Sequence, residues 1–230
     1  MIEERNVPAR VNLYYDLFVP DGARDRQMPL LIALHGYEGN KESMMAKATG
    51  LNSKDFIVCS LQGPNGFFVR NGQGGARPRI GFGWMMQWKA EETIRLHHET
   101  VGSIIDTVDR DYRLDRQSIF LMGFSQSVSL NYRFAFTYPG RIRGVVAVCG
   151  GIPGDWAEQK YSQSNTDVLI LAGETDEFYP IERTRTFKGA LETRAGSVDF
   201  HSFAAGHVFP NDVLPIINEW LLARCRKSNA

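Results

Sequence analysis

The sequence predicts an α/β fold in which helices cover both faces of a mostly parallel central sheet. Two observations support this. Short apolar runs alternate along the chain with longer amphipathic segments, as in layered α/β domains. Four of the apolar runs are continuous and end at glycine, which is typical of parallel strands buried on both faces. With 230 residues, 43% hydrophobic content and no internal repeat, residues 1–230 are expected to form a single domain.

Seven segments have the composition of strands. The first, residues 11–19, alternates polar and apolar residues and is expected to form an antiparallel edge. The others cover residues 29–36, 56–63, 118–124, 144–151, 167–173 and 197–203. Helical patterns cover residues 91–111, 126–138, 181–195 and 211–226. Because ligands bind at the carboxyl ends of strands in open α/β sheets, the residues just after each strand are the candidates for chemistry.

One connection, residues 63–88, is long for a loop and rich in glycine and aromatic residues. Two interpretations are open: a flexible loop on the surface, or a loop folded against a cleft. The second reading is favoured, because five exposed aromatic rings would leave much apolar surface in water. Phe82 and Trp84 are therefore the predicted substrate-binding residues, in a loop that shapes the pocket.

The charge balance and the cysteines exclude several classes of function. Lys plus Arg and Asp plus Glu each number 26, so no long-range attraction to nucleic acid or anionic lipid is expected. The N-terminus is charged and no segment has about 18 consecutive apolar residues, which favours a soluble cytoplasmic protein without a membrane span. Cys59, Cys149 and Cys225 are scattered, so reduced structural thiols and no metal site are expected. A small molecule is the expected partner, no cofactor is implied, and the oligomeric state is left open.

The stretch "GFSQS", residues 123–127, lies between an apolar strand and an amphipathic helix. A serine at such a turn carries its hydroxyl above the sheet, and Gly123 leaves room for the close backbone approach. Ser125 is therefore the candidate nucleophile. The alternative is a serine that caps the helix. The usual pattern is G-x-S-x-G, and here Ser127 replaces the last glycine.

A serine nucleophile needs a base, and the base needs an acid that orients it. Asp176 follows the strand at 167–173 and His207 follows the strand at 197–203, so both are expected beside Ser125. The competitors for the acid are Glu174 and Glu177. The competitors for the base are His201, which lies within a strand, and His97 and His98, whose side chains diverge on a helix.

An acyl-transfer site also needs two backbone donors for the oxyanion. The N–H of Gln126, at the start of the helix, is one candidate. The turn at His35-Gly36 directs the N–H of Tyr37 toward the same place, unless "HG" is only a turn. Glu38 beside it would oppose an oxyanion unless its charge faces solvent.

The segments "LHGYEGN", "GFSQS", "GETDEFYP" and "AAGHVFP", in this order, resemble the phospholipase/carboxylesterase branch of the α/β-hydrolases, which includes acyl-protein thioesterase-like enzymes. The resemblance covers roughly residues 30–222. It implies an α/β-hydrolase fold, a triad of Ser125, Asp176 and His207, and oxyanion donors at Tyr37 and Gln126. Family members usually carry glycine where Ser127 stands. Too few residues separate Cys149 from Asp167 for a large cap domain.

These features predict a metal-independent serine esterase that cleaves carboxylic esters through an acyl-enzyme. A cleft without a large cap favours short to medium or aromatic acyl groups. An acyl-protein thioesterase is the alternative enzyme. A non-catalytic small-ligand receptor with the same fold is the alternative from another class.

Overall fold

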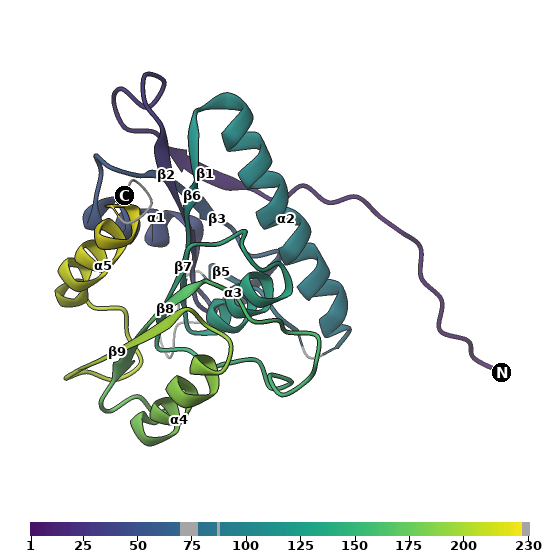
Figure 1. The fold of residues 1–230 in the computed structure, drawn as a ribbon. Helices are drawn as coiled ribbons and strands as arrows, with labels where there is room; N and C mark the ends of the chain where they lie inside the picture. The colour runs from purple at the N-terminus through teal and green to yellow at the C-terminus, as the bar shows by residue number, and fades with distance from the viewer. Residues whose placement is uncertain (70–77, 87, 227–230) are drawn as a thin grey trace.

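A computed structural model of the chain describes residues 1–69, 78–86 and 88–226. Its central sheet has seven strands in the order β1-β3-β2-β6-β7-β8-β9 (Figure 1). Their bounds are β1 Tyr15–Phe18, β2 Met28–Leu34, β3 Ile57–Leu61, β6 Leu114–Phe124, β7 Gly144–Val148, β8 Asp167–Gly173 and β9 Ser197–Phe203. Strand β1 is antiparallel to β3, and all other neighbours in this sheet are parallel. The predicted parallel sheet with an antiparallel edge is confirmed.

Helices cover both faces of this sheet. On one face lie α2, α3 and α4, and on the other α1 and α5. Their bounds are α1 Lys41–Leu51, α2 Ala90–Asp111, α3 Gln126–Thr137, α4 Ile181–Glu192 and α5 Leu214–Arg226, the last preceded by a short 3-10 turn at Asn211–Val213. Successive strand residues point to opposite faces, so Leu30 and Ile32 join one core layer and Leu31 and Ala33 the other. This explains why the strand sequences are continuously apolar.

Helix α1 is absent from the sequence-based prediction. Its buried stripe consists of only Met44, Ala48 and Leu51, which is a weak apolar signal. Asn40 caps its start, because its side chain accepts a hydrogen bond of 2.8 Å from the N–H of Ser43. Packing against α5 and strand β3 supplies the remaining stability of α1.

The connection predicted as a loop over residues 63–88 contains a β-hairpin. Strands β4 (Asn65–Val69) and β5 (Arg79–Gly83) pair in an antiparallel two-stranded sheet. The N–H of Phe82 donates to the carbonyl of Gly39 at 3.2 Å, which joins the hairpin to the turn after β2. Residues 70–77 and 87 of this connection lie outside the described residues.

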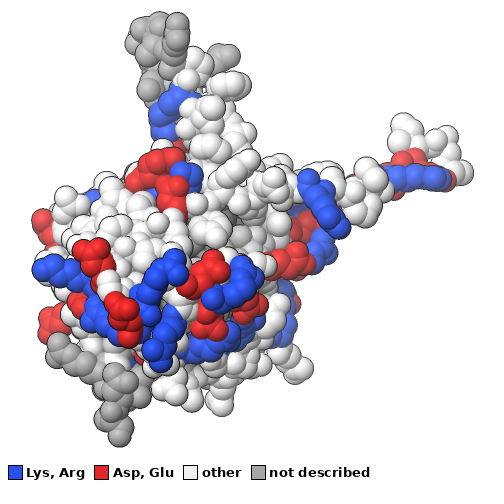
Figure 2. All heavy atoms as spheres, turned by 90° about the horizontal axis from the view of Figure 1, so that it is seen from above, with Lys and Arg blue, Asp and Glu red and all other residues white. Residues whose placement is uncertain are grey.

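The carboxyl ends of the central strands remain accessible. Between β7 and β8, residues 149–166 form turns without a helix or strand, so the described part of the chain contains no large cap over the sheet. On the face that Figure 2 shows, basic and acidic side chains lie interspersed. Within the described residues, no helix is both long enough and apolar enough to cross a membrane.

Candidate active site

Ser125 lies in a sharp turn between β6 and α3. Its backbone has φ 56° and ψ −114°, a conformation that L residues rarely adopt. The turn is held because the N–H of Ser125 donates to the carbonyl of Val148 at 2.9 Å. A Cβ at position 123 would lie 2.8 Å from Nδ2 of Asn131, so the turn requires Gly123. The predicted strand–turn–helix context of Ser125 is therefore present.

Ser127 is fully buried below this turn. Its hydroxyl donates to the carbonyl of Leu34 at 3.0 Å and accepts from the N–H of Phe124 at 3.1 Å. These bonds join the start of α3 to β2 and to the end of β6. A serine is accommodated here because both its oxygen and its proton have partners.

Asp176 and His207 lie at the carboxyl ends of β8 and β9, beside Ser125. Nε2 of His207 is 2.8 Å from Oγ of Ser125, and Nδ1 of His207 is 2.9 Å from Oδ2 of Asp176. We refer to these three residues as the Ser-His-Asp cluster. Its distances and order are those that proton transfer from a serine to an acid-oriented imidazole requires.

The carboxylate of Asp176 is held by further donors. Its Oδ1 accepts the N–H groups of Phe178 and Tyr179, each at 2.9 Å. Burial by itself raises the pKa of Asp176, but the N–H of Tyr179, the His207 ring and the N–H of Phe178 together lower it below its usual value. The side chain is 1% exposed, so Asp176 is a buried anion whose orientation is fixed.

The competing acids and bases lie elsewhere. Glu174 is exposed and accepts a hydrogen bond from Ser202 at 2.9 Å. Glu177 and His201 are exposed. His97 and His98 lie on α2, where they pack against Phe134. Among all these candidates, the described structure brings Asp176 and His207 together with Ser125.

Tyr37 and Gln126 line the same cavity as Ser125. His35 supports the turn before Tyr37: its Nδ1 lies 2.7 Å from the carbonyl of Gly36, and its Nε2 accepts the N–H of Gly63 at 2.9 Å. Burial lowers the pKa of His35, which favours the neutral ring that this pairing needs. Within residues 1–69, 78–86 and 88–226, the N–H groups of Tyr37 and Gln126 donate to no other group.

The charge of Glu38 is balanced by the hairpin. Nη2 of Arg79 lies 3.0 Å from Oε2 of Glu38, and Nη1 donates to the Glu38 carbonyl at 2.8 Å. A Cβ at position 81 would lie 3.1 Å from Cα of Glu38, so Gly81 lets the hairpin press against this turn. This ion pair reduces the repulsion that the Glu38 carboxylate would exert on an oxyanion beside Tyr37.

Phe82 and Trp84 are not among the residues that line the cavity, so their role in substrate binding stays a prediction that this cavity does not support. Trp84 is 2% exposed, and its indole N–H donates to the carbonyl of His35 at 2.8 Å. Phe82 belongs to β5 and pairs with Gly66. The amide side chain of Gln126 holds this segment in place. Its Oε1 accepts the N–H of Trp84 at 2.7 Å, and its Nε2 donates to the carbonyl of Met85 at 3.0 Å.

The cavity has a volume of about 960 Å³. Residues missed by sequence reasoning form much of its wall: Met85, Ile152, Phe178, Tyr179, Arg183 and Phe187. The ring of Phe178 lies 4.8 Å from that of His207, and the ring of Tyr179 lies 5.8 Å from it and nearly parallel. The proximity of "FYP" to Asp176 in the sequence was the available signal for these two aromatic residues.

Cys149, Asp176 and His207 place potential metal ligands within 4.8 Å of one another. Burial raises the pKa of the Cys149 thiol to about 12, and its Sγ donates to the carbonyl of Val208 at 3.4 Å. A neutral thiol is a poor metal ligand, and the other two residues are bonded to each other. We therefore interpret these three residues as contacts that hold the loop of His207 in place, and not as a metal centre.

The sheet order and the turn at Ser125 are those of an α/β-hydrolase fold. A model of the phospholipase/carboxylesterase family matches residues 19–224, so the chain belongs to this family and the resemblance noted in the sequence is confirmed. No curated protein gives a significant sequence match.

Solved structures of low identity share the fold. The carboxylesterase of Bacillus cereus is 20% identical over 92% of this chain and 94% of its own, with a TM-score of 0.70. SOBER1 of Arabidopsis thaliana is 17% identical over 86% of this chain and 99% of its own, with a TM-score of 0.67. YahD, solved with malic acid, is 16% identical over 93% of this chain and all of its own (100%), with a TM-score of 0.71.

Proposed function

We propose that the protein is a serine hydrolase that cleaves carboxylic esters through an acyl-enzyme. The observation that carries this proposal is the pair of contacts of His207, 2.8 Å to Oγ of Ser125 and 2.9 Å to the buried Asp176, at the wall of an accessible cavity. Membership of the phospholipase/carboxylesterase family supports the same reaction class.

In the proposed reaction, Oγ of Ser125 attacks the ester carbonyl carbon while Nε2 of His207 takes the hydroxyl proton. The carbonyl electron pair moves onto the oxygen, which the N–H groups of Tyr37 and Gln126 stabilise. When the intermediate collapses, the C–O bond to the alcohol breaks and His207 gives its proton to the leaving oxygen. In the second half, His207 takes a proton from water as the water oxygen attacks the carbonyl carbon of the acyl-enzyme. The C–O bond to Oγ of Ser125 then breaks, His207 returns the proton to Oγ, and the acid is released. Asp176 keeps the imidazole in the required tautomer and stabilises its cation.

The substrate proposal follows from the cavity. About 960 Å³ accommodates a small ester, and Met85, Ile152 and Phe187 offer apolar contact to an acyl group. Short to medium or aromatic acyl groups remain the proposed range. This range now rests on these walls, because Phe82 and Trp84 lie outside the cavity.

Turnover of p-nitrophenyl butyrate by the purified protein tests the proposal. Ser125→Ala should reduce kcat on the order of 10⁶-fold, as expected for a triad nucleophile, while the melting temperature stays close to that of the parent. A parent protein that does not hydrolyse any ester in a p-nitrophenyl panel would instead fit a non-catalytic receptor. Retained activity in Ser125→Ala would exclude Ser125 as the nucleophile.

An acyl-protein thioesterase is the second candidate, because the cavity has exposed aromatic residues that a protein-bound acyl group could pass. Tyr37 is 57% exposed and Phe178 is 64% exposed. Acyl-thioesters included in the same panel discriminate the two activities: a higher kcat/KM for the thioester than for the oxygen ester of the same acid would favour the thioesterase.

A further inference from the structure

The charged residues that line the cavity differ in how their charges are matched. Glu38 pairs with Arg79 at 3.0 Å, and Arg133 pairs with Asp155 at 2.8 Å. Arg183 also lines the cavity, yet within the described ranges its guanidinium forms no ion pair and donates no hydrogen bond. The cavity therefore presents one cation whose charge no described carboxylate matches.

Two aromatic residues of the cavity wall, Phe187 and Tyr179, lie near both Arg183 and the Ser-His-Asp cluster. Its guanidinium carbon is 5.8 Å from the centre of the Phe187 ring, a buried ring of the cavity wall. Its positive charge also acts on the hydroxyl of Tyr179. The ring of Tyr179 in turn stacks on His207 at 5.8 Å. Arg183 thus lies against one ring of this aromatic wall, and the proposed base His207 lies against the other.

Both aromatic rings also fix the shape of this part of the cavity. A Cβ at position 151 would lie 2.9 Å from the Tyr179 ring and 3.6 Å from the Phe187 ring, so Gly151 is what leaves these rings room. The result is an apolar wall with a guanidinium at its rim. Such a surface suits a ligand that has a short carbon chain and a terminal anion.

We propose that Arg183 binds a carboxylate carried by the substrate, so that the favoured esters are anionic ones, such as monoesters of dicarboxylic acids. A guanidinium offers two parallel N–H donors that match a carboxylate, and it is weakly hydrated compared with an ammonium. This inference rests on the proposed ester hydrolysis at Ser125 and specifies its substrate class. The carboxylate belongs either to the acyl part or to the alcohol part, and the experiment separates these two sources.

Two matched substrate pairs test the inference. For the acyl part, mono-4-nitrophenyl adipate is compared with 4-nitrophenyl hexanoate, which has the same chain length without the charge. For the alcohol part, the butyrate ester of 4-hydroxybenzoate is compared with the butyrate ester of methyl 4-hydroxybenzoate. Values of kcat and KM are measured at low and at high salt.

Arg183→Gln should raise KM about fivefold for the anionic member of at least one pair, the effect of losing one partly solvated ion pair. It should leave both neutral esters within about twofold. Arg183→Lys should retain part of the preference. In the parent protein, KM for the anionic ester should rise with salt, and this dependence should disappear in Arg183→Gln.

Arg185→Gln is the matched control. Arg185 lies on the same helix, is exposed and pairs with Glu182 at 2.9 Å, but it does not line the cavity. It should leave all four esters unchanged. The inference is overturned if Arg183→Gln changes neither pair selectively, or if Arg185→Gln has the same effect. Hydrolysis of the neutral esters reports the proposed function separately, because it does not depend on Arg183.

Discussion

Strand β8 has an aspartate near each end, and the two aspartates have opposite surroundings. Asp167 begins the strand, and Asp176 follows its last residue by three positions. Both residues are buried: taken as whole residues, Asp167 is 8% exposed and Asp176 is 4% exposed. Oδ2 of Asp167 lies 2.9 Å from Arg143 and 3.0 Å from Arg224, whereas Asp176 pairs with one histidine. The same strand therefore supports a carboxylate between two guanidinium groups and a carboxylate that is paired with an imidazole.

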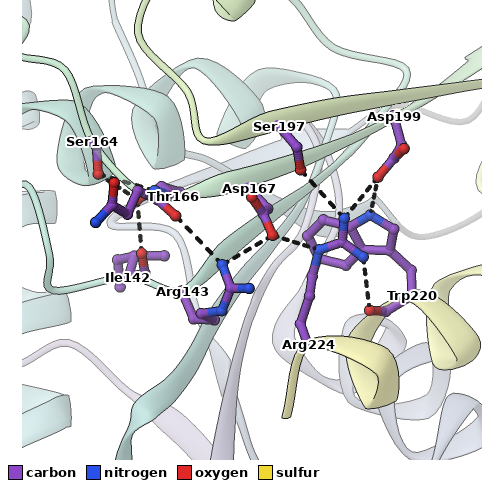
Figure 3. A network of polar contacts seen from close by, with 10 residues as sticks. Ile142, Arg143, Ser164, Thr166, Asp167, Ser197, Asp199, Trp220 and Arg224 are labelled. Atoms are coloured by element: carbon purple, nitrogen blue, oxygen red, sulfur yellow. Dashed lines mark hydrogen bonds and ion pairs between the residues drawn. The ribbon is translucent and has the colours of Figure 1, made fainter. Parts of the chain in front are cut away.

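The network around Asp167 extends to the neighbouring strand and helix. Figure 3 shows Arg224 between Asp167 and Asp199, and its guanidinium carbon lies 3.8 Å from the centre of the Trp220 ring. Arginine stays protonated at any pH of interest, so Arg143 and Arg224 do not exchange protons with Asp167. In the proposed reaction, His207 takes the proton of Ser125 while its Nδ1 stays hydrogen-bonded to Asp176. We therefore expect the amino end of the strands to serve stability and the carboxyl end to serve the proposed proton transfer.

The largest expected difference between the two aspartates is in catalysis. Asp176→Asn should lower kcat about 10⁴-fold, since the amide no longer favours the imidazole tautomer that accepts the serine proton. Asp167→Asn should keep kcat within about twofold, because it lies at the opposite end of the strand. Ester hydrolysis well below the melting temperature measures both. Equal losses in the two variants would contradict the division between the two ends.

The second difference is in stability. Asp167→Asn should lower the free energy of unfolding by about 3 kcal/mol, since it leaves Arg143 without its buried carboxylate partner. Urea denaturation followed by circular dichroism measures the change. Asp16→Asn is the control: Asp16 pairs with Lys41 at 2.7 Å and its side chain is 40% exposed, so a loss of no more than about 1 kcal/mol is expected. A loss in Asp167→Asn no larger than in this control would make the network structurally unimportant.

The third prediction concerns histidines outside both networks. Burial, followed by the charge of His98, lowers the pKa of His97 to about 3, and burial with the charge of Arg133 lowers the pKa of His98 to about 4. As pH falls below about 6.5, the unfolded chain gains protons at these histidines and the folded chain does not, so stability decreases. The contribution is about 1.4 kcal/mol per pH unit for each histidine within this window.

His97→Phe should remove one such contribution to the slope of unfolding free energy against pH between about pH 6.5 and 4.5, where most carboxylates stay ionised. The slope is compared, rather than the stability at one pH, since the substitution also alters packing against Trp84 and Phe134. His201→Asn, at an exposed position of β9, is the control. An unchanged slope in His97→Phe would show that His97 does not couple folding to pH.

The smallest expected effect comes from Ser127. Ser127→Ala loses the hydrogen bonds to Leu34 and Phe124 and should destabilise the protein by about 1 to 2 kcal/mol. Ser129→Ala should change stability less, because the Ser129 hydroxyl lies 3.5 Å from its acceptor, the carbonyl of Gln126. The urea midpoints of the two variants measure these changes in stability. A larger loss of stability in Ser129→Ala than in Ser127→Ala would contradict this prediction.

The sequence was sufficient where chemistry follows a strand directly. Ser125 and Asp176 each follow a continuous apolar run, and His207 follows the mixed polar and apolar strand at 197–203, so their convergence at one edge of the sheet could be predicted from local patterns. The parallel sheet could be predicted for the same reason. Helix α1 was missed, because only three small or flexible side chains mark its buried face.

The hairpin and the cavity wall depend on contacts between distant residues. From the sequence alone, Gly81 is one of several glycines in a predicted loop. In the structure it allows β5 to approach Glu38. Trp84 looked like a pocket residue, but a hydrogen bond to the His35 carbonyl holds it inside. Arg183 is one of two arginines on α4, and both are exposed. No local pattern distinguishes it from Arg185, since the difference is only in which of them reaches the cavity.

Labelling with a fluorophosphonate probe tests the central claim most directly, since the probe reacts covalently with an activated serine. We expect one probe molecule per chain, mapped by peptide mass spectrometry to Ser125, and much slower labelling of Asp176→Asn than of Asp167→Asn. A label on Ser127 or Ser129, or equal labelling rates in the two aspartate variants, would contradict it.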